Sequence, residues 1–220
     1  MLSKPKLFSA DRNHAITTAE ANSFRQNFRE YFKSFSCSFV FFAREALEEL
    51  LAQPYAIGFR YYYSNPLGDA LVLVPTAADG NDLLNEQCVK ASMPKIPLTA
   101  LGEYDPNQVS HSITPSKAAV GTSMYQNVRP KNQPIAGFYG KNIVRKILQQ
   151  LDCQGISFYF GASCRGKRVT VLVGIDSCGR AMWHGSLAEM SAICPPYCPT
   201  EKHLLNYSMI EKSKIQEIAG

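Results

Sequence analysis

Two cysteines and two histidines near the carboxyl end are the residues of this chain best suited to chemistry. Thiolate and imidazole groups are the usual ligands of tetrahedral zinc. The spacing of the two cysteines fits familiar zinc modules, but the spacing of the two histidines does not. Two alternatives stay open: the cysteines pack as small apolar side chains, or they form a disulfide in an oxidising compartment. The candidate zinc ligands are His184, Cys194, Cys198 and His203.

A second group of candidates is basic and lies in the second half of the chain. Residues 1–110 carry 10 basic and 12 acidic side chains, whereas residues 111–220 carry 13 and 6. Such asymmetry indicates either an anionic partner or an attraction between the two halves, and a plain solvated surface is the simpler alternative. The candidate residues for binding an anion or a partner are Lys141, Arg145, Lys146, Arg165, Lys167 and Arg168.

No familiar catalytic pattern is present. The cysteines at positions 153, 164 and 178 have no histidine nearby in the sequence that would activate a thiol. The glycines do not follow the spacing of a phosphate-binding loop, and no pair of carboxylates recurs in both halves. We therefore name no catalytic residue and lean against an enzyme.

The chain repeats itself at a shift of 97 positions. Ile16 matches Ile113, and Gly58 matches Gly155. The gaps in this match fall at turns, where insertions are tolerated. Because an internal repeat determines the architecture of a chain, we predict two tandem homologous modules.

Each module is predicted to contain two helices and three strands. Thr17 and Glu20 form a capping box that starts a first helix. The segments FFAREALEELLAQ and FYGKNIVRKILQQ carry an apolar stripe at helical spacing, whereas GFRYYYS, GISFYFG, ALVLVPT and RVTVLVG are typical of strands. Short third strands are expected at residues 81–84 and 180–183. The predicted fold class is α+β: two tandem modules, each with two helices followed by a three-stranded antiparallel meander, and a C-terminal helix.

Four regions follow from this pattern. They are a first module with an N-terminal arm (1–93), a proline-rich linker (94–112), a second module (113–198) and a C-terminal helix (199–220). Hydrophobic residues make up 45% of the chain and charged residues 19%, which is typical of a packed core and not of disorder. The sequence shows neither a spanning segment nor a secretory signal, and its odd number of cysteines favours reduced thiols. We therefore expect a cytoplasmic protein that does not bind membranes.

The helix REALEELLAQ, the strand GISFYFG, the hairpin VLVGIDSCGR and the closing CPPYC form a recognisable pattern. It resembles a group of small proteins common in Bacteroidota, in which a single module usually ends in a Cys-Pro-Pro-rich segment. Here the resemblance covers residues 16–198 as two copies. The first copy departs from the pattern, because MPKIP stands where the second has CPPYC. The resemblance implies a lineage and no particular activity.

The function predicted first is a non-catalytic binding or assembly protein that uses divergent surfaces of the two modules. Glu48 and Glu49 correspond to Arg145 and Lys146, whereas the apolar positions of the same helices stay apolar. The alternatives are a metal-dependent or thiol-dependent protein with its site in the second module, and nucleic-acid binding through the basic second module. We expect a protein partner and do not favour nucleic acid. Zinc is the cofactor that the metal alternative would need, and the oligomeric state is left open.

Overall fold

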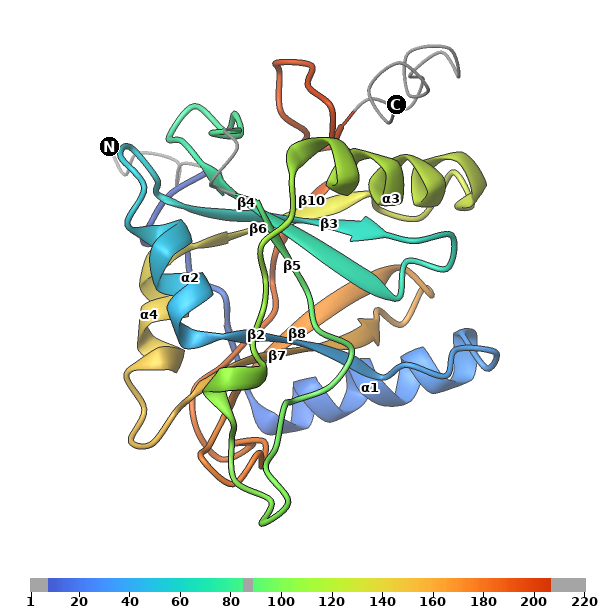
Figure 1. The fold of residues 1–220 in the computed structure, drawn as a ribbon. Coiled ribbons are helices and arrows are strands. Elements are labelled where there is room, and N and C mark those ends of the chain that lie inside the picture. The colour runs from blue at the N-terminus through green and yellow to red at the C-terminus, as the bar shows by residue number, and fades with distance from the viewer. Residues whose placement is uncertain (1–7, 85–88, 207–220) are drawn as a thin grey trace, which may run out of the picture.

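The computed structural model describes residues 8–84 and 89–206. Within these ranges the chain forms four α-helices and two five-stranded antiparallel sheets (Figure 1). The predicted α+β class with antiparallel sheets is confirmed. No helix in the described ranges has the length and apolar character needed to cross a membrane.

Each sheet combines strands from both halves of the chain. Sheet A consists of β1 (Ala15–Ile16), β9 (Leu187–Ala188), β8 (Arg168–Ile175), β7 (Gly155–Ala162) and β2 (Phe39–Ala43), in that order. Sheet B consists of β10 (Ala192–Cys194), β6 (Ala136–Gly140), β3 (Gly58–Ser64), β4 (Ala70–Thr76) and β5 (Lys90–Ala91), in that order. Thus β2 pairs with β7, and β6 pairs with β3. A three-stranded meander from one half is flanked in each sheet by strands from the other half.

The helices cover the outer faces of the sheets and close one end. They are α1 (Thr18–Tyr31), α2 (Arg44–Leu51), α3 (Pro115–Val128) and α4 (Lys141–Leu148), with a short 3-10 helix η1 (Pro106–Gln108). Figure 1 shows α3 over sheet B, α1 under sheet A, and α2 and α4 side by side at one end. The predicted capping box starts α1: the Thr17 hydroxyl accepts from the Glu20 amide (3.2 Å), and the Glu20 carboxylate accepts from the Thr17 amide (2.7 Å).

Elements and contacts recur at the shift seen in the sequence. Helices α2 and α4 each have eight residues, and their first residues are 97 positions apart. The first residues of strands β3 and β7 are also 97 positions apart. The Arg44 amide donates to the Gln154 carbonyl (3.0 Å), and the Lys141 amide donates to the Ile57 carbonyl (2.8 Å). A duplicated chain would produce this recurrence.

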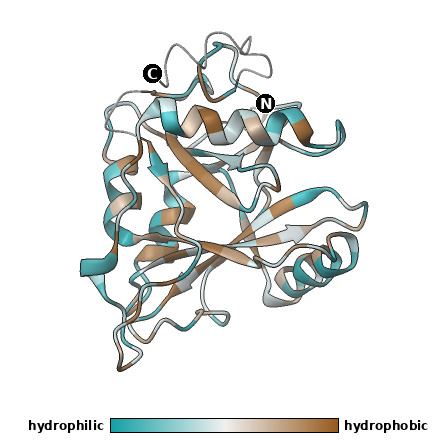
Figure 2. Cartoon of the chain, turned by 45° about the vertical axis from the view of Figure 1, so that its right-hand side comes forward, coloured by the Kyte–Doolittle hydropathy of each residue, from teal (hydrophilic) through white to brown (hydrophobic). Residues whose placement is uncertain are grey.

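The main core lies between the sheets and under α2 and α4. Phe59 and Tyr139 of sheet B meet Phe158 of sheet A, with ring centroids 5.9 to 6.4 Å apart. The leucines of α2 and the apolar residues Ile143, Val144, Ile147 and Leu148 of α4 belong to the same cluster, as periodicity predicted. Leu151, which the same stripe placed in the core, lies after the end of α4 and is exposed. Figure 2 shows apolar colour along the strands and alternating colour on the helices.

The second helix of each module is shorter than predicted. The segments FFA and FYG belong to strands β2 and β6, and the helices begin at Arg44 and Lys141. Residues 40–43 and 136–140 are all buried, because β2 and β6 lie within the layers of the protein. A strand that is buried on both faces shows no alternation of apolar and polar residues. The sequence pattern therefore did not distinguish β2 and β6 from the apolar stripe of the helix that follows each of them.

The third strands also differ from the prediction. Residues 81–84 and 180–183 make only single bridges, at Asp82 and Ala181, and β5 and β9 take the third place in the meanders. The predicted turns are present, since Gly80 and Gly179 have φ values of 86° and 70°. Residues 199–206 form no helix, and the rest of the predicted C-terminal helix (207–220) lies outside the described residues.

Candidate functional site

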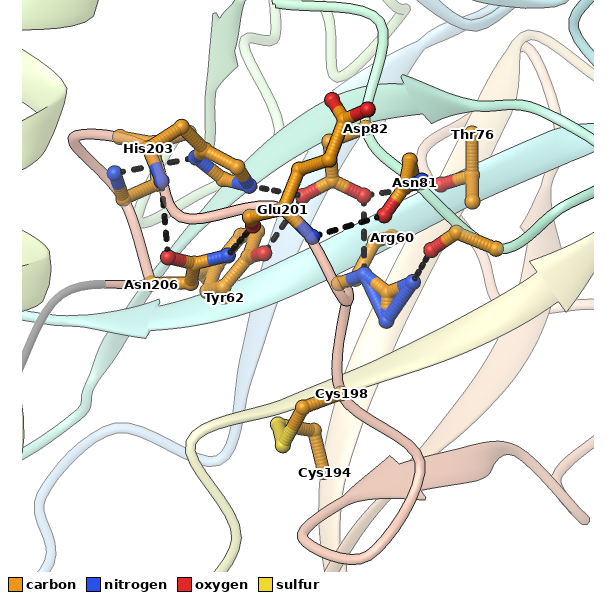
Figure 3. Close-up of polar contacts among 12 residues, drawn as sticks. Arg60, Tyr62, Thr76, Asn81, Asp82, Cys194, Cys198, Glu201, His203 and Asn206 are labelled. Carbon is orange, nitrogen blue, oxygen red and sulfur yellow. Dashed lines mark hydrogen bonds and ion pairs between the residues drawn. A yellow bond between two sulfur atoms is a disulfide. The ribbon is translucent and has the colours of Figure 1, made fainter.

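The predicted zinc ligand His203 belongs to a polar cluster that holds the C-terminal segment against sheet B (Figure 3). Asp82, in the turn after β4, accepts hydrogen bonds from Arg60 Nε (2.9 Å) and from the Tyr62 hydroxyl (2.5 Å). His203 Nε2 lies 3.1 Å from the same carboxylate, and the side chains of Arg60 and Asp82 are fully buried. We call these four residues the Asp82 cluster.

The Asp82 cluster resembles the histidine–carboxylate pair of hydrolases only in part. In such enzymes one ring nitrogen stays free to take a proton from a nucleophile. Here Nδ1 of His203 accepts from the Leu205 amide (3.3 Å), and Nε2 faces Asp82. A second guanidinium nitrogen of Arg60 donates to the Tyr197 carbonyl (3.2 Å). This arrangement can clamp a segment, but it offers no free base.

The other predicted zinc ligands are not grouped with His203. Cys194, at the end of β10, forms a disulfide with Cys198, and bonded sulfurs are not thiolate ligands. His184 is exposed in the loop before β9. Among the residues that the structure describes, no three His, Cys, Asp or Glu side chains are placed to hold a metal ion. The predicted four-ligand site is therefore not assembled in this structure.

Burial makes two of the four unpaired cysteines described by the structure less reactive. Burial raises the pKa of the Cys37 and Cys153 thiols above the ordinary range, which disfavours the reactive thiolate. Cys164 and Cys178 are exposed in turns. These environments support structural or incidental roles.

The predicted basic residues lie at two separate places. Lys141, Arg145 and Lys146 are on α4, which precedes β7, whereas Arg165 and Lys167 are in the turn after β7. Figure 1 shows α4 and the tip of the β7–β8 hairpin on opposite sides of the molecule. The candidate residues therefore do not form one continuous basic surface.

Arg168 faces the protein interior, contrary to the prediction that it presents its charge to a partner. Its guanidinium donates to the carbonyls of Leu67 (2.9 Å) and Gly68 (2.7 Å), in the turn that joins β3 to β4. It also lies 4.4 Å from the ring centroid of Tyr63 and 4.7 Å from that of Phe35. Arg168 begins β8 of sheet A, so these contacts tie sheet A to sheet B.

His14 is a buried residue that sequence reasoning missed. Its Nε2 accepts from the Gly140 amide (3.1 Å), so Nδ1 carries the proton and donates to the Met190 carbonyl (3.1 Å). Burial, with the nearby Arg12 charge, lowers the pKa of His14 to about 4. His14 is therefore neutral at pH 7 and links three parts of the main chain.

His111 does the same 97 positions further along the chain. Its Nε2 accepts from the Ala43 amide (3.0 Å), and its Nδ1 donates to the Ala91 carbonyl (2.7 Å). Burial lowers its pKa as well. His14 and His111 are 97 positions apart, and each lies two residues before an isoleucine that the sequence comparison had matched. The repeat was thus the signal that could have found this pair.

Helices α2 and α4 together form a face of the molecule with opposite charges on its two sides. The helices run antiparallel, because Arg44 at the start of α2 donates to the Leu148 carbonyl at the end of α4, and Lys141 at the start of α4 donates to the Ala56 carbonyl after α2. We call this surface the α2/α4 face. Its exposed charged side chains are Glu45, Glu48 and Glu49 on α2 and Arg145 and Lys146 on α4.

Within the described ranges, no ion pair joins the carboxylates of α2 to Arg145 or Lys146 of α4. Glu48 pairs with Arg44 of its own helix (3.1 Å), and Glu49 pairs with Lys90 of β5. The cations of α4 have no acidic partner among the described residues. Within the described ranges, Glu45 on α2 and the cations Arg145 and Lys146 on α4 are therefore charges of the α2/α4 face without an ion-pair partner.

A groove beside this face runs between α2, β5 and the start of α3, with a volume of about 730 Å³. Its buried cation, Lys90, is already paired with Glu49. A smaller cavity of about 280 Å³ continues along α3. There the edge of β4 is closed, since the Leu71 amide donates to the Ser92 hydroxyl (2.9 Å) and the Leu71 carbonyl accepts from the Ser92 amide (2.9 Å). At Leu71, the described structure therefore leaves no free edge of β4 for an added peptide strand.

Comparisons of the chain with protein-family models, with curated proteins and with solved structures found no match. The buried histidines and the Asp82 cluster have their polar atoms engaged within the protein. The α2/α4 face, in contrast, exposes its charged side chains at the surface of the described structure.

Proposed function

We propose that this chain is a non-catalytic binding or assembly protein that acts through the α2/α4 face. One observation carries the proposal: exposed positions 97 residues apart have opposite charge, Glu48 against Arg145 and Glu49 against Lys146, while the buried positions beneath them stay apolar. Packing accounts for the apolar positions, but it gives no reason for a charge reversal. Complementary charge across an interface selects partners and speeds encounter.

We also propose that the two halves arose by tandem duplication, within the lineage of small Bacteroidota proteins that the sequence resembles. The shared shift of 97 positions in α2 and α4, in β3 and β7, and in the hydrogen bonds of His14 and His111 supports this origin. After duplication, one surface of each half is free to diverge. This would convert a single module into a protein with two unlike helices on one face.

A photo-cross-linking amino acid placed at Gln149, the exposed C-cap of α4, tests the proposed function in intact cells. We expect a discrete covalent adduct, because a partner bound to the α2/α4 face would lie within reach of this side chain. The matched control places the same amino acid at Arg165, exposed in the β7–β8 turn. Absence of an adduct at Gln149, or the same adduct from both positions, would contradict the proposal.

Cytoplasmic residence remains a proposal, and the Cys194–Cys198 disulfide bears on it. Structural disulfides are typical of oxidising compartments and rare in the cytosol. Alkylation of free thiols before cell lysis, followed by mass spectrometry of the 194–198 peptide, distinguishes the cytoplasm from an oxidising compartment. Alkylated Cys194 and Cys198 would support the cytoplasm, and an intact disulfide would place the protein in an oxidising compartment.

A further inference from the structure

We infer that the partner of the α2/α4 face is a second copy of this chain, bound about a two-fold axis. The inference rests on the proposed function and adds the identity of the partner. It is drawn from three features of the face: the antiparallel arrangement of its helices, the distribution of its charges and the apolar side chains at its ends.

The antiparallel arrangement permits a self-complementary interface. In a two-fold dimer the same patch of both copies meets. If the axis runs parallel to the helices and between them, α2 of one copy lies against α4 of the other. If the axis runs across the helices, α2 lies against α2 and the two rows of glutamates repel. The charges therefore select the first orientation, with Glu45 and Glu48 opposite Arg145 and Lys146.

The remaining charged groups around the face do not cancel this pattern. Arg44 and Lys90 each neutralise one glutamate of α2, which leaves Glu45 without an ion pair among the described residues. Near α4, the Asp11 carboxylate accepts from the Asn142 amide group, and Asp152 accepts from the Ser177 hydroxyl (2.7 Å). These donors are neutral, so both carboxylates keep their charge, but within the described ranges neither forms an ion pair with Arg145 or Lys146, and the two cations stay available to an acidic α2 from a second copy.

Two large apolar side chains lie just after the helices that form this face. Tyr55 follows α2 and is 87% exposed, and Leu151 follows α4 and is 92% exposed. Because each helix begins where the other ends, Tyr55 and Leu151 lie at opposite ends of the face. Their burial on association would add a contribution that salt does not screen.

The size of the face predicts a weak dimer. A helix of eight residues is only about 12 Å long, so two such helices cover less than the roughly 800 Å² per partner of a standard stable interface. Exposed ion pairs are also screened by salt. We therefore expect a dimer with a dissociation constant in the micromolar range that weakens as salt is added.

The test uses two charge-reversed variants of the full chain. In the first, Arg145→Glu and Lys146→Glu make α4 acidic; in the second, Glu45→Lys and Glu48→Lys make α2 basic. Each variant alone would place like charges on both sides of the dimer, so we expect its association to be about tenfold weaker than that of the wild type or worse. When the two variants are mixed, acidic α4 meets basic α2 and acidic α2 meets basic α4, and the heterodimer should form at wild-type strength. Sedimentation velocity over a concentration series measures the three cases.

The control reverses charge at the β7–β8 turn, with Arg165→Glu and Lys167→Glu, and should leave the dimer unchanged. Circular dichroism of each variant establishes that it is folded. A monomeric wild type at all concentrations overturns the inference, and so does a dimer that survives in both variants or a mixture that does not associate. The proposed function and this inference can fail independently. An adduct from Gln149 to a different protein would support binding by the α2/α4 face but exclude the second copy as the partner.

Discussion

His14 and His111 show how single residues of this chain use polar chemistry for structure. Each imidazole accepts a hydrogen bond from one main-chain amide and donates a hydrogen bond to one main-chain carbonyl. The donating nitrogen already carries a proton, so it cannot also bind a metal or take up a proton. The pKa of His14 is about 4 in the folded protein and 6.5 ordinarily. As the pH falls from 6.5 towards 4, the unfolded chain therefore binds a proton first, and His14 lowers the stability of the fold.

Glu189 acts in the opposite direction and gives a prediction at the residue scale. Burial raises the pKa of its carboxyl from 4.5 to about 7, so its contribution to stability is present below pH 4.5 and lost as the pH rises through 7. Because a glutamine side chain does not ionise, the Glu189→Gln variant should not lose this stability as the pH rises. The free energy of unfolding of the variant, relative to the wild type, should rise by about 3 kcal/mol between pH 4.5 and pH 7.5.

Urea denaturation of both proteins across this pH range measures the effect. Glu103→Gln, at an exposed site in the loop before η1, is the matched control and should give a flat difference. A flat difference for Glu189→Gln as well would show that the native carboxyl is not held protonated.

The sequence related individual site residues to one another only where they are close along the chain. Cys194 and Cys198 are four positions apart, and their disulfide was one of the alternatives. Arg60, Asp82 and His203 are brought together from three distant segments, and no local spacing connects them. Arg168 was predicted at the surface because basic residues next to a turn are usually solvated. In the structure its guanidinium lies between the two sheets.

At the scale of elements, the Asp82 cluster fastens the segment after β10 to sheet B. The carboxylate compensates the buried Arg60 guanidinium, and removing one member of a buried ion pair leaves the other charge without compensation. Asp82→Asn should therefore lower the free energy of unfolding by about 3 to 5 kcal/mol. Tyr62→Phe, which removes one hydrogen bond to the same carboxylate, should cost about 1 kcal/mol.

Chemical denaturation gives both values, and hydrogen exchange of residues 199–206 reports the loosening of the fastened segment. Asp152→Asn is the control, because Asp152 is exposed after α4 and its carboxylate accepts from the Ser177 hydroxyl (2.7 Å). If Asp82→Asn and Asp152→Asn cost the same, the cluster does not fasten the segment. If Asp82→Asn does not fold, the milder Tyr62→Phe variant still tests the prediction through exchange.

The long strands β3, β4, β7 and β8 followed from periodicity, but their partners did not. GFRYYYS and ALVLVPT coincide with β3 and β4, because alternating and β-branched residues favour extended chain whatever lies beside it. The pairing of β2 with β7 and of β6 with β3 depends on contacts more than 70 residues apart in the chain. Local pattern carries no information about that choice, so the sequence suggested two modules without revealing that each sheet takes strands from both halves of the chain.

For the whole molecule, this exchange makes each half incomplete. Residues 1–112 contain the β3–β4–β5 meander of sheet B but lack β6, which covers its other edge, and their β1 and β2 would have no sheet A to join. Residues 113–220 have the mirrored deficiency. The aromatic core around Phe59, Tyr139 and Phe158 also needs side chains from both halves.

The two halves expressed as separate chains, 1–112 and 113–220, should therefore be largely unfolded alone and should fold when mixed. A half of about 110 residues is long enough for a stable domain on size alone, so failure to fold would reflect the missing strands and not the length. Circular dichroism and the cooperativity of urea denaturation distinguish the cases, with the intact chain as the reference. Cooperative unfolding of either half alone would mean that a module is self-sufficient, and that the exchanged strands β2 and β6 add to a fold that a single module already reaches.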